Sequence, residues 1–253
     1  MRNGAAPRRL WLWAVMLVGA LAIVAAANPS SLSLENNAVR DFGGRRNGPL
    51  AVAFFSGDMG FHFGMSGDLA ERLAATGLPV IGFSSPKYFG QHRSRAEAGR
   101  IVADGLRLTL ARTGARRVVL VGQSYGADIV ATAASALPPD LRARLAAVAM
   151  VVPAQSVYFR ADPLGFAYRG TPDARPLDTI GEIGARRLVC IYGLEEEDSL
   201  CPPLVALGAH VAGLPGGHYM HHDSSRVGDT LLALLRASLH DDHAAGAGKG
   251  NMM

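Results

Sequence analysis

The residues best suited to chemistry lie in a short stretch where a serine stands between two glycines, Gly122-Gln123-Ser124-Tyr125-Gly126. The apolar, β-branched run Val118–Val121 precedes it, and small residues typical of a helix follow it. A Gly-x-Ser-x-Gly sequence between a strand and a helix is typical of a nucleophile elbow, a tight turn that exposes the serine hydroxyl. Glycines on both sides remove steric conflict in that turn. The pattern predicts Ser124 as a nucleophile, and an ordinary strand–helix turn is the alternative.

A serine is a weak nucleophile unless a base accepts its proton and an acid orients the base. In proteins with such an elbow, the acid and then the histidine follow the serine along the chain. We predict His218 as the base, because it lies on a glycine-rich loop directly after an apolar run. We predict Asp198 as the acid. Glu195 and Glu196 are alternatives, and a solvated acidic turn is the interpretation without function.

Ester cleavage through a tetrahedral intermediate also needs N–H groups that bind the oxyanion. The backbone N–H of Tyr125 is the first candidate, because it begins the helix after the serine. The second is expected from the glycine-containing loop around residues 56–60, at Asp58 or Met59. Each such donor contributes on the order of 3 kcal/mol to the transition state.

Neither a metal nor a cofactor is expected. A serine, a base and an oxyanion hole cleave an ester without either. His221, His222 and Asp223 follow His218 closely, but the sequence offers no convincing remote fourth ligand for a metal.

The elements that must position these residues alternate along the chain. Apolar runs predict strands, and periodic runs that begin at Ser66, at the Ser94–Glu97 capping box, at Ala127 and at Ser224 or Ser225 predict helices. This alternation predicts an α/β fold, with a mostly parallel sheet flanked by helices on both faces. The site is then expected at the carboxyl ends of the strands. The strand runs are Leu50–Ser56, Leu78–Phe83, Val118–Val121, Leu145–Val152, Arg187–Tyr192 and His210–Leu214.

Length and composition favour a single globular domain. The chain has 253 residues, of which 49% are hydrophobic and 18% charged. We expect a leader at 28–48, the domain at 49–240 and a disordered tail at 241–253. The proline-rich segment 153–180 is expected to be a short, lid-like insertion that covers the site.

The N-terminus predicts export. Residues 1–27 combine a basic start, the apolar stretch Leu10–Val24 and an Ala-x-Ala cleavage site, which is typical of a signal peptide. An uncleaved membrane anchor is the alternative. Removing the three arginines of this segment from 25 basic residues leaves 22, against 21 acidic ones. No face for nucleic acid is therefore expected.

The only two cysteines, Cys190 and Cys201, are expected to form a disulfide in an oxidising compartment, and two buried thiols are the alternative.

Several stretches together resemble one known family: Phe55–Asp58, Tyr88-Phe89, Gly122–Asp128, Glu196–Pro202 and Leu214–His218. This combination is similar to the VirJ/AcvB family of bacterial virulence proteins over roughly residues 50–238, a far more specific match than the elbow alone. The resemblance implies an exported α/β-hydrolase fold. It also implies a periplasmic serine hydrolase that releases lysine from lysyl-phosphatidylglycerol, with Ser124, Asp198 and His218 as the triad. VirJ-like members are also linked to type IV secretion, which implies secretion machinery as a partner.

An aminoacyl ester carries a cationic amino group, so a carboxylate is expected near its binding place. Asp128 and Asp58 are candidates, while a structural hydrogen bond is the alternative for Asp128. Tyr88 is the other candidate for binding the substrate. The chain departs from the family at Met59 and Phe61 in the first loop, and at Gly90 after Tyr88-Phe89. A serine esterase with another substrate, and a non-catalytic binding protein on the same fold, stay as alternatives.

Overall fold

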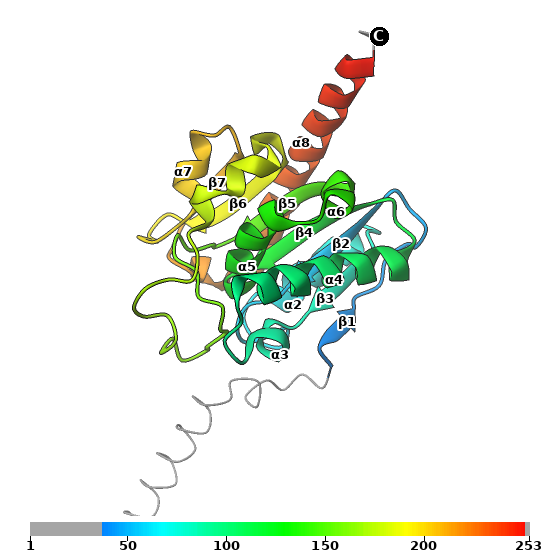
Figure 1. Cartoon of the computed structure of the whole chain (residues 1–253). Helices are drawn as coiled ribbons and strands as arrows, with labels where there is room; N and C mark the ends of the chain where they lie inside the picture. The colour runs from blue at the N-terminus through cyan, green and yellow to red at the C-terminus, as the bar shows by residue number, and fades with distance from the viewer. Residues whose placement is uncertain (1–36, 251–253) are drawn as a thin grey trace, which may run out of the picture.

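The protein is built on a seven-stranded sheet with the order β1-β3-β2-β4-β5-β6-β7 (Figure 1). The computed structural model describes residues 37–250, with side chains as far as residue 241. Strands β2 to β7 are parallel, and β1 pairs antiparallel with β3 at one edge. The strands are β1 (Val39–Asp41), β2 (Leu50–Phe55), β3 (Val80–Phe83), β4 (Arg117–Gln123), β5 (Leu145–Val151), β6 (Leu188–Gly193) and β7 (His210–Leu214).

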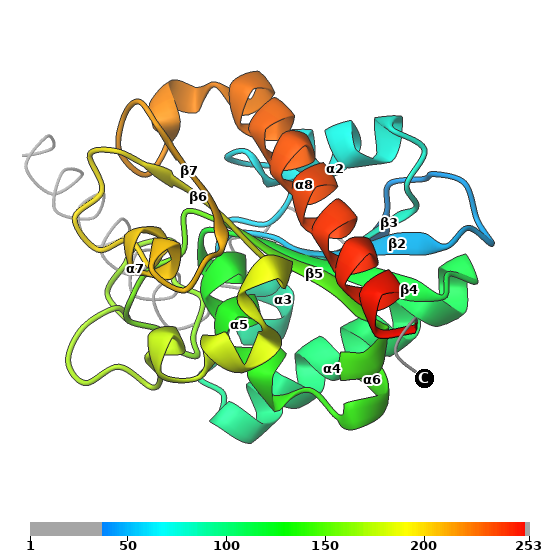
Figure 2. The same ribbon diagram turned by 90° about the horizontal axis from the view of Figure 1, so that it is seen from above.

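Helices cover both faces of the sheet, as Figure 2 shows from above. Helices α2 (Ser66–Ala75) and α8 (Ser224–Gly250) pack on one face. Helices α4 (Arg95–Thr113), α5 (Tyr125–Ala133) and α6 (Pro139–Arg144) pack on the other. The short helix α3 (Ser85–Phe89) follows β3, and α7 (Cys201–Val205) lies between β6 and β7. This is the predicted mostly parallel sheet between two helical layers.

The alternation of side chains along the strands explains the two layers. In β2, Val52 and Phe54 enter the apolar cluster beneath α2 and α8, whereas Ala53 and Phe55 enter the cluster beneath α4 and α5. Both faces are buried, so the central strands are apolar throughout, as a covered parallel sheet requires.

The predicted helix signals at α4 are present in the structure. The Ser94 hydroxyl accepts the Glu97 N–H and the Glu97 carboxylate accepts the Ser94 N–H, which forms the reciprocal capping box. Gly114 ends the helix with a φ of 69°, in the left-handed region that favours glycine.

Two local expectations differ from the structure. Ser66 does not cap α2, because Met65 is the N-cap residue and makes no side-chain cap hydrogen bond. The tail predicted to be disordered from residue 241 is helical as far as Gly250, within α8. The predicted signal peptide at 1–27 lies outside the described residues.

The carboxyl ends of the parallel strands share one edge of the sheet, which we call the catalytic edge. Its loops are residues 56–65 after β2, 84–94 after β3, the first part of the segment after β5 (152–175), 194–200 after β6 and 215–223 after β7. The insertion 153–180 forms the long loop seen at the same end of the molecule as α3 in Figure 1. Strand β4 ends at this edge directly before Ser124.

Candidate active site

Ser124 stands in a sharp turn between β4 and α5. Its backbone has a φ of 51° and a ψ of −124°, a conformation that ordinary residues rarely adopt. A Cβ atom at Gly122 would lie 2.3 Å from the carbonyl oxygen of Gly126, and one at Gly126 would lie 2.2 Å from that of Phe55. Only glycine therefore fits at both positions, which is the steric reason for the Gly-x-Ser-x-Gly sequence.

The structure brings the serine, a histidine and a carboxylate into one hydrogen-bonded chain. Ser124 Oγ lies 2.8 Å from His218 Nε2. On the other side of the ring, His218 Nδ1 lies 2.7 Å from Glu196 Oε1. The imidazole can accept the hydroxyl proton at Nε2 while the carboxylate holds its Nδ1–H, as in a Ser-His-acid triad.

The carboxylate that contacts His218 is that of Glu196, so the prediction of Asp198 as the acid was wrong. Asp198 is exposed, and its backbone carbonyl accepts the Gln155 N–H at 3.3 Å. Its neighbour Ser199 bridges to Ala154, so this part of the loop pairs with the chain after β5. Glu196 comes three residues after the end of β6, where its longer side chain reaches the imidazole.

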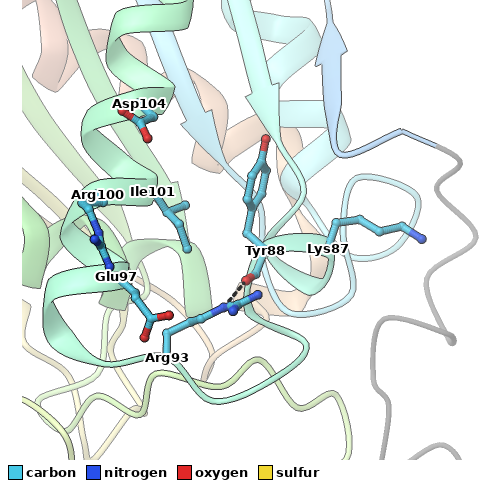
Figure 3. Close-up of a pocket in the computed structure, with 7 residues that line it drawn as sticks. All are labelled: Lys87, Tyr88, Arg93, Glu97, Arg100, Ile101 and Asp104. Atoms are coloured by element: carbon cyan, nitrogen blue, oxygen red, sulfur yellow. Dashed lines mark hydrogen bonds between the residues drawn. The ribbon is translucent and has the colours of Figure 1, made fainter.

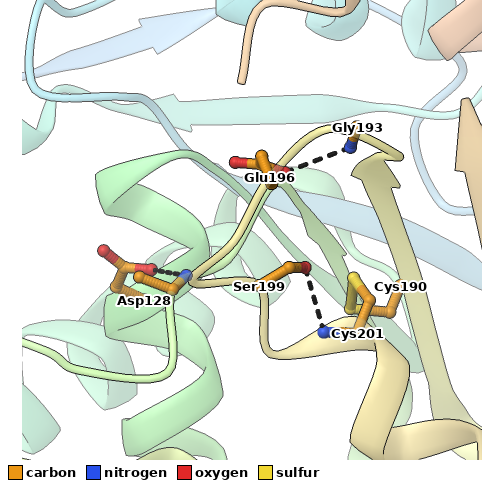
Figure 4. Close-up of a disulfide and its surroundings, with 7 residues drawn as sticks. Asp128, Cys190, Gly193, Glu196, Ser199 and Cys201 are labelled. Atoms are coloured by element: carbon orange, nitrogen blue, oxygen red, sulfur yellow. Dashed lines mark hydrogen bonds between the residues drawn. A yellow bond between two sulfur atoms is a disulfide. The ribbon is translucent and has the colours of Figure 1, made fainter. Parts of the chain in front are cut away.

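Backbone contacts fix the loop that carries Glu196 (the acid loop, residues 194–200) against the loop that carries His218 (the histidine loop, residues 215–223). The N–H groups of Glu195 and Leu194 donate to the carbonyls of Gly216 and Leu214. A Cβ at Gly193 would lie 2.2 Å from the Gly217 carbonyl oxygen, so a side chain there would push the loops apart. Figure 4 shows the second oxygen of Glu196 accepting the Gly193 N–H, at 3.1 Å. Both oxygens of this carboxylate are therefore held.

The loop expected to supply the second oxyanion donor (the oxyanion loop, residues 56–65) lies against the turn that carries Ser124. Ser66 Oγ accepts the Gly57 N–H at 3.0 Å and donates to Gln123 Oε1 at 2.7 Å. Ser66 therefore links the loop that carries Asp58 and Met59 to the residue before Ser124. The N–H of Tyr125 begins α5, so it has no acceptor within that helix.

The insertion reaches this loop through Tyr168. Its hydroxyl donates to Asp58 Oδ2 at 3.0 Å and accepts the Asp162 N–H at 2.9 Å. The Tyr168 ring stacks on Tyr125, with centroids 6.2 Å apart. The predicted cover of the site is thus tied to the oxyanion loop and to the residue after the nucleophile. The sequence suggests Tyr168, with Tyr158, Phe159 and Phe166, as a lining of a lipid groove or as part of the core, but no local pattern marks its contact with Asp58.

Asp128, on the first turn of α5 after Ser124, has other carboxylates near it that raise its pKa. Burial raises the pKa of Asp128 well above its ordinary value, and Asp58, Asp198 and Glu196 add to the rise. Burial also raises the pKa of Asp58, although the Tyr168 hydroxyl opposes the rise. Asp128 Oδ1 accepts the Ala154 N–H at 2.7 Å, so the structural hydrogen bond considered for it exists (Figure 4). The carboxylates near Asp128 favour binding of a cation at this place.

A disulfide joins β6, the strand before the acid loop, to α7, the helix after that loop. Cys190 in β6 and Cys201 at the start of α7 are bonded and fully buried (Figure 4). Ser199 Oγ accepts the Cys201 N–H at 3.2 Å. The covalent link closes a short loop that contains Glu196.

Tyr88, a predicted substrate-binding residue, contributes to a surface cavity. It lines a surface cavity of about 330 Å³ beside α3 and α4, together with Lys87, Arg93, Arg100 and Asp104 (Figure 3). The Arg93 guanidinium donates to the Tyr88 carbonyl at 3.0 Å. Ser124 and His218 do not line this cavity. The role of Tyr88 in binding the substrate stays a prediction.

The described part of the chain contains no group of three His, Cys, Asp or Glu side chains placed to hold a metal ion. Among residues 37–250, no helix is long and apolar enough to cross a membrane.

The elbow and the sheet define the class of protein, an α/β hydrolase, and solved structures share this fold. A hydrolase of the alpha/beta superfamily from Xanthomonas campestris has a TM-score of 0.51 and 16% identity, covering 76% of this chain and 98% of its own. The α/β hydrolase GrgF from Penicillium sp. sh18 has a TM-score of 0.57 and 11% identity, with coverages of 80% and 94%. Est1E from Butyrivibrio proteoclasticus with ferulic acid bound has a TM-score of 0.53 and 13% identity, with coverages of 75% and 89%.

The chain belongs to the family of bacterial virulence proteins called VirJ, whose family model matches residues 50–239. This confirms the resemblance inferred from the motifs. No curated protein sequence matches the chain.

Proposed function

We propose that this protein is a serine esterase that cleaves the aminoacyl ester of lysyl-phosphatidylglycerol in the periplasm. The observation that carries the proposal is the chain of contacts from Ser124 through His218 to Glu196, at 2.8 and 2.7 Å. A serine with this geometry beside an oxyanion hole is equipped for acyl transfer.

In the first half of the reaction, Ser124 Oγ attacks the ester carbonyl and His218 Nε2 accepts the hydroxyl proton. The N–H of Tyr125, with that of Asp58 or Met59, binds the developing oxyanion. When the carbon–oxygen ester bond breaks, His218 returns the proton to the glycerol oxygen, and phosphatidylglycerol leaves. Glu196 holds the imidazole in position and stabilises its charged form.

In the second half, water attacks the aminoacyl ester on Ser124. His218 accepts a proton from the water and then gives it to Ser124 Oγ as the acyl–oxygen bond breaks. The amino acid leaves as its carboxylate, and the free enzyme is restored. The contacts of His218 with Ser124 and Glu196 support both halves of this reaction.

The charge around the serine supports a cationic acyl group. Burial raises the pKa of Asp58, Asp128 and Asp198, and the charges of Asp58, Asp198 and Glu196 raise that of Asp128 further. An ammonium group placed among them would relieve this repulsion, whereas a neutral acyl group would not. Asp128 and Asp58 are the proposed partners of the α-amino or lysyl ammonium.

The proposed compartment follows from the sequence and the cysteines. Residues 1–27 have the pattern of an export signal, and the disulfide is of a kind that persists in oxidising compartments. An uncleaved signal would keep the same domain attached to the outer face of the inner membrane.

The test is amino-acid release from purified lipids. Wild-type protein is expected to free lysine from lysyl-phosphatidylglycerol and leave phosphatidylglycerol, and Ser124→Ala is expected to free none. N-acetylated lysyl-phosphatidylglycerol, which keeps the ester but loses the α-ammonium charge, should react more slowly. Hydrolysis of simple esters without release of lysine would overturn the lipid assignment. No hydrolysis of any ester would support the non-catalytic binding protein, including one that docks on secretion machinery.

A further inference from the structure

Most of the large apolar side chains that are exposed lie at the catalytic edge. Among the described residues, nine large hydrophobic side chains are exposed, and six of them lie in the loops of this edge. Isolated exposed apolar residues are ordinary, but a concentration on one face marks an interaction surface. The six are Met59, Phe63, Leu164, Phe166, Leu194 and Tyr219.

These six side chains accompany the groups of the proposed active site. Met59 and Phe63 lie on the oxyanion loop, and Leu194 lies two residues before Glu196. Tyr219 is 53% exposed and packs edge-on against the His218 ring, with centroids 5.4 Å apart. The apolar surface and the reacting groups therefore share the same loops, and whatever covers this edge lies beside the site.

The insertion adds the chemistry of a lipid interface. Leu164 is 48% exposed and Phe166 is 58% exposed, and the Arg169 guanidinium lies 5.5 Å from the Phe166 ring centroid. Apolar side chains beside a guanidinium suit the boundary between acyl chains and phosphate groups. The segment is held to the oxyanion loop by the Tyr168–Asp58 hydrogen bond, so it is a fixed part of this edge.

The chain also enters the fold at this edge. Val39 pairs with Phe83, the last residue of β3, and the Ser84 N–H donates to the Ala38 carbonyl. The first described residues therefore lie at the catalytic edge, and the apolar run Leu10–Val24 precedes them in the sequence. A membrane that holds this segment would face the same edge.

We infer that the catalytic edge is a docking surface for a phospholipid bilayer, entered by these six apolar side chains and oriented with Ser124 toward the lipid. The inference deepens the proposed function, because a lipid ester would then reach the serine without leaving the bilayer surface. Membrane docking does not require hydrolysis, so the two proposals can fail separately.

The test is hydrogen exchange of the full chain carrying Ser124→Ala, with and without vesicles of equal parts phosphatidylglycerol and phosphatidylcholine. Vesicles are expected to slow exchange in loops 57–65, 163–169 and 215–220. They should not slow it at 183–187 and 205–209, which lie before β6 and β7 at the opposite edge. Attachment through residues 1–36 could bring the same edge near the bilayer, so the matched variants below decide whether the apolar side chains enter it.

Matched variants make the test specific. Leu164→Ser with Phe166→Ser should reduce the protection of loops 57–65 and 215–220, and should lower vesicle affinity about tenfold, since binding scales with buried apolar area. The control is Val205→Ser with Leu207→Ser, which removes side chains exposed to similar extents, 60% and 44%, away from the catalytic edge. It should change neither quantity.

Equal effects from both pairs, or no protection of the catalytic edge, would overturn the inference. Protection without lipid that grows with protein concentration would assign the surface to a second copy of the chain and also overturn it. Lipid hydrolysis is absent from this experiment, so its outcome leaves the esterase proposal to its own test.

Discussion

At the scale of single residues, the account depends on which carboxylate serves His218. Glu196→Gln keeps the shape of the side chain but removes its charge, so the imidazole loses the partner that stabilises its protonated form. We expect kcat/KM for an activated ester to fall by about 10³–10⁴-fold, as loss of the acid does in other triads. Asp198→Asn is the matched control and should stay within about threefold, because the structure places Asp198 away from the ring. The reverse order of effects would restore Asp198 as the acid.

Asp128 gives a second prediction at this scale, with a defined pH dependence. Burial raises its pKa in the folded protein above the ordinary 3.8, so folding takes up a proton. The stability that Asp128 contributes is present below its ordinary pKa and is lost as the pH rises toward the folded value. Asp128→Asn does not titrate and keeps an oxygen for the Ala154 N–H. Its melting temperature should therefore exceed that of wild type by more near pH 7 than near pH 4.

The same variant tests the proposed role of Asp128 in binding the substrate. If the carboxylate meets the ammonium group, Asp128→Asn should raise KM for the lysyl ester and leave a neutral ester unaffected. An equal effect on both esters would mean that Asp128 does not bind the ammonium group and has only its structural role, the hydrogen bond from the Ala154 N–H.

At the scale of elements, the disulfide between β6 and α7 is expected to position Glu196 as well as to stabilise the fold. Replacing Cys190 and Cys201 by serine should lower the free energy of unfolding by about 2–4 kcal/mol. It should also slow labelling of Ser124 by a fluorophosphonate well below the melting temperature, because the acid loop gains freedom.

The control for this prediction is Leu231→Ala in α8, a fully buried residue on the opposite face of the sheet from α5. It should lower stability by about 2–5 kcal/mol but leave the labelling rate unchanged. If the Cys190→Ser, Cys201→Ser variant and the Leu231→Ala variant were labelled at equal rates, the disulfide would stabilise the fold without positioning Glu196.

The elements were largely predictable from the sequence, because their signals are local. Apolar runs place the central strands within about two residues, and the Ser94–Glu97 capping box and Gly114 mark the ends of α4. The assignment of the acid was not local. Four carboxylates follow β6 within five residues, and the turn at Gly193, pressed against the Gly217 carbonyl, decides which one reaches His218.

Ser66 shows the same limit for positioning residues. A serine before an apolar helix predicts an N-cap. Here its hydroxyl bonds Gln123, 57 residues away in the chain, and so holds the oxyanion loop. No pattern around Ser66 contains that contact. Tyr168 likewise meets Asp58 only because the insertion folds back over the sheet edge.

At the scale of the whole molecule, one edge of the sheet carries acids that follow β2, β4 and β6 in the chain. Their field should attract a cationic substrate and should weaken as salt screens it. We predict that the ratio of kcat/KM for a soluble lysyl ester to that for its N-acetylated form falls as ionic strength rises from about 10 mM to 0.15 M. A ratio that does not change with salt would contradict electrostatic selection by these acids.

The most direct test of the central claim, that Ser124 is a nucleophile activated by His218 and Glu196, is the intact mass of the protein after reaction with a fluorophosphonate. Wild-type protein should gain one phosphonyl group, located on Ser124 by peptide analysis. Ser124→Ala and His218→Ala should gain none, and Glu196→Gln should react far more slowly. A wild-type protein that stays unmodified, or that is modified at a residue other than Ser124, would contradict the account.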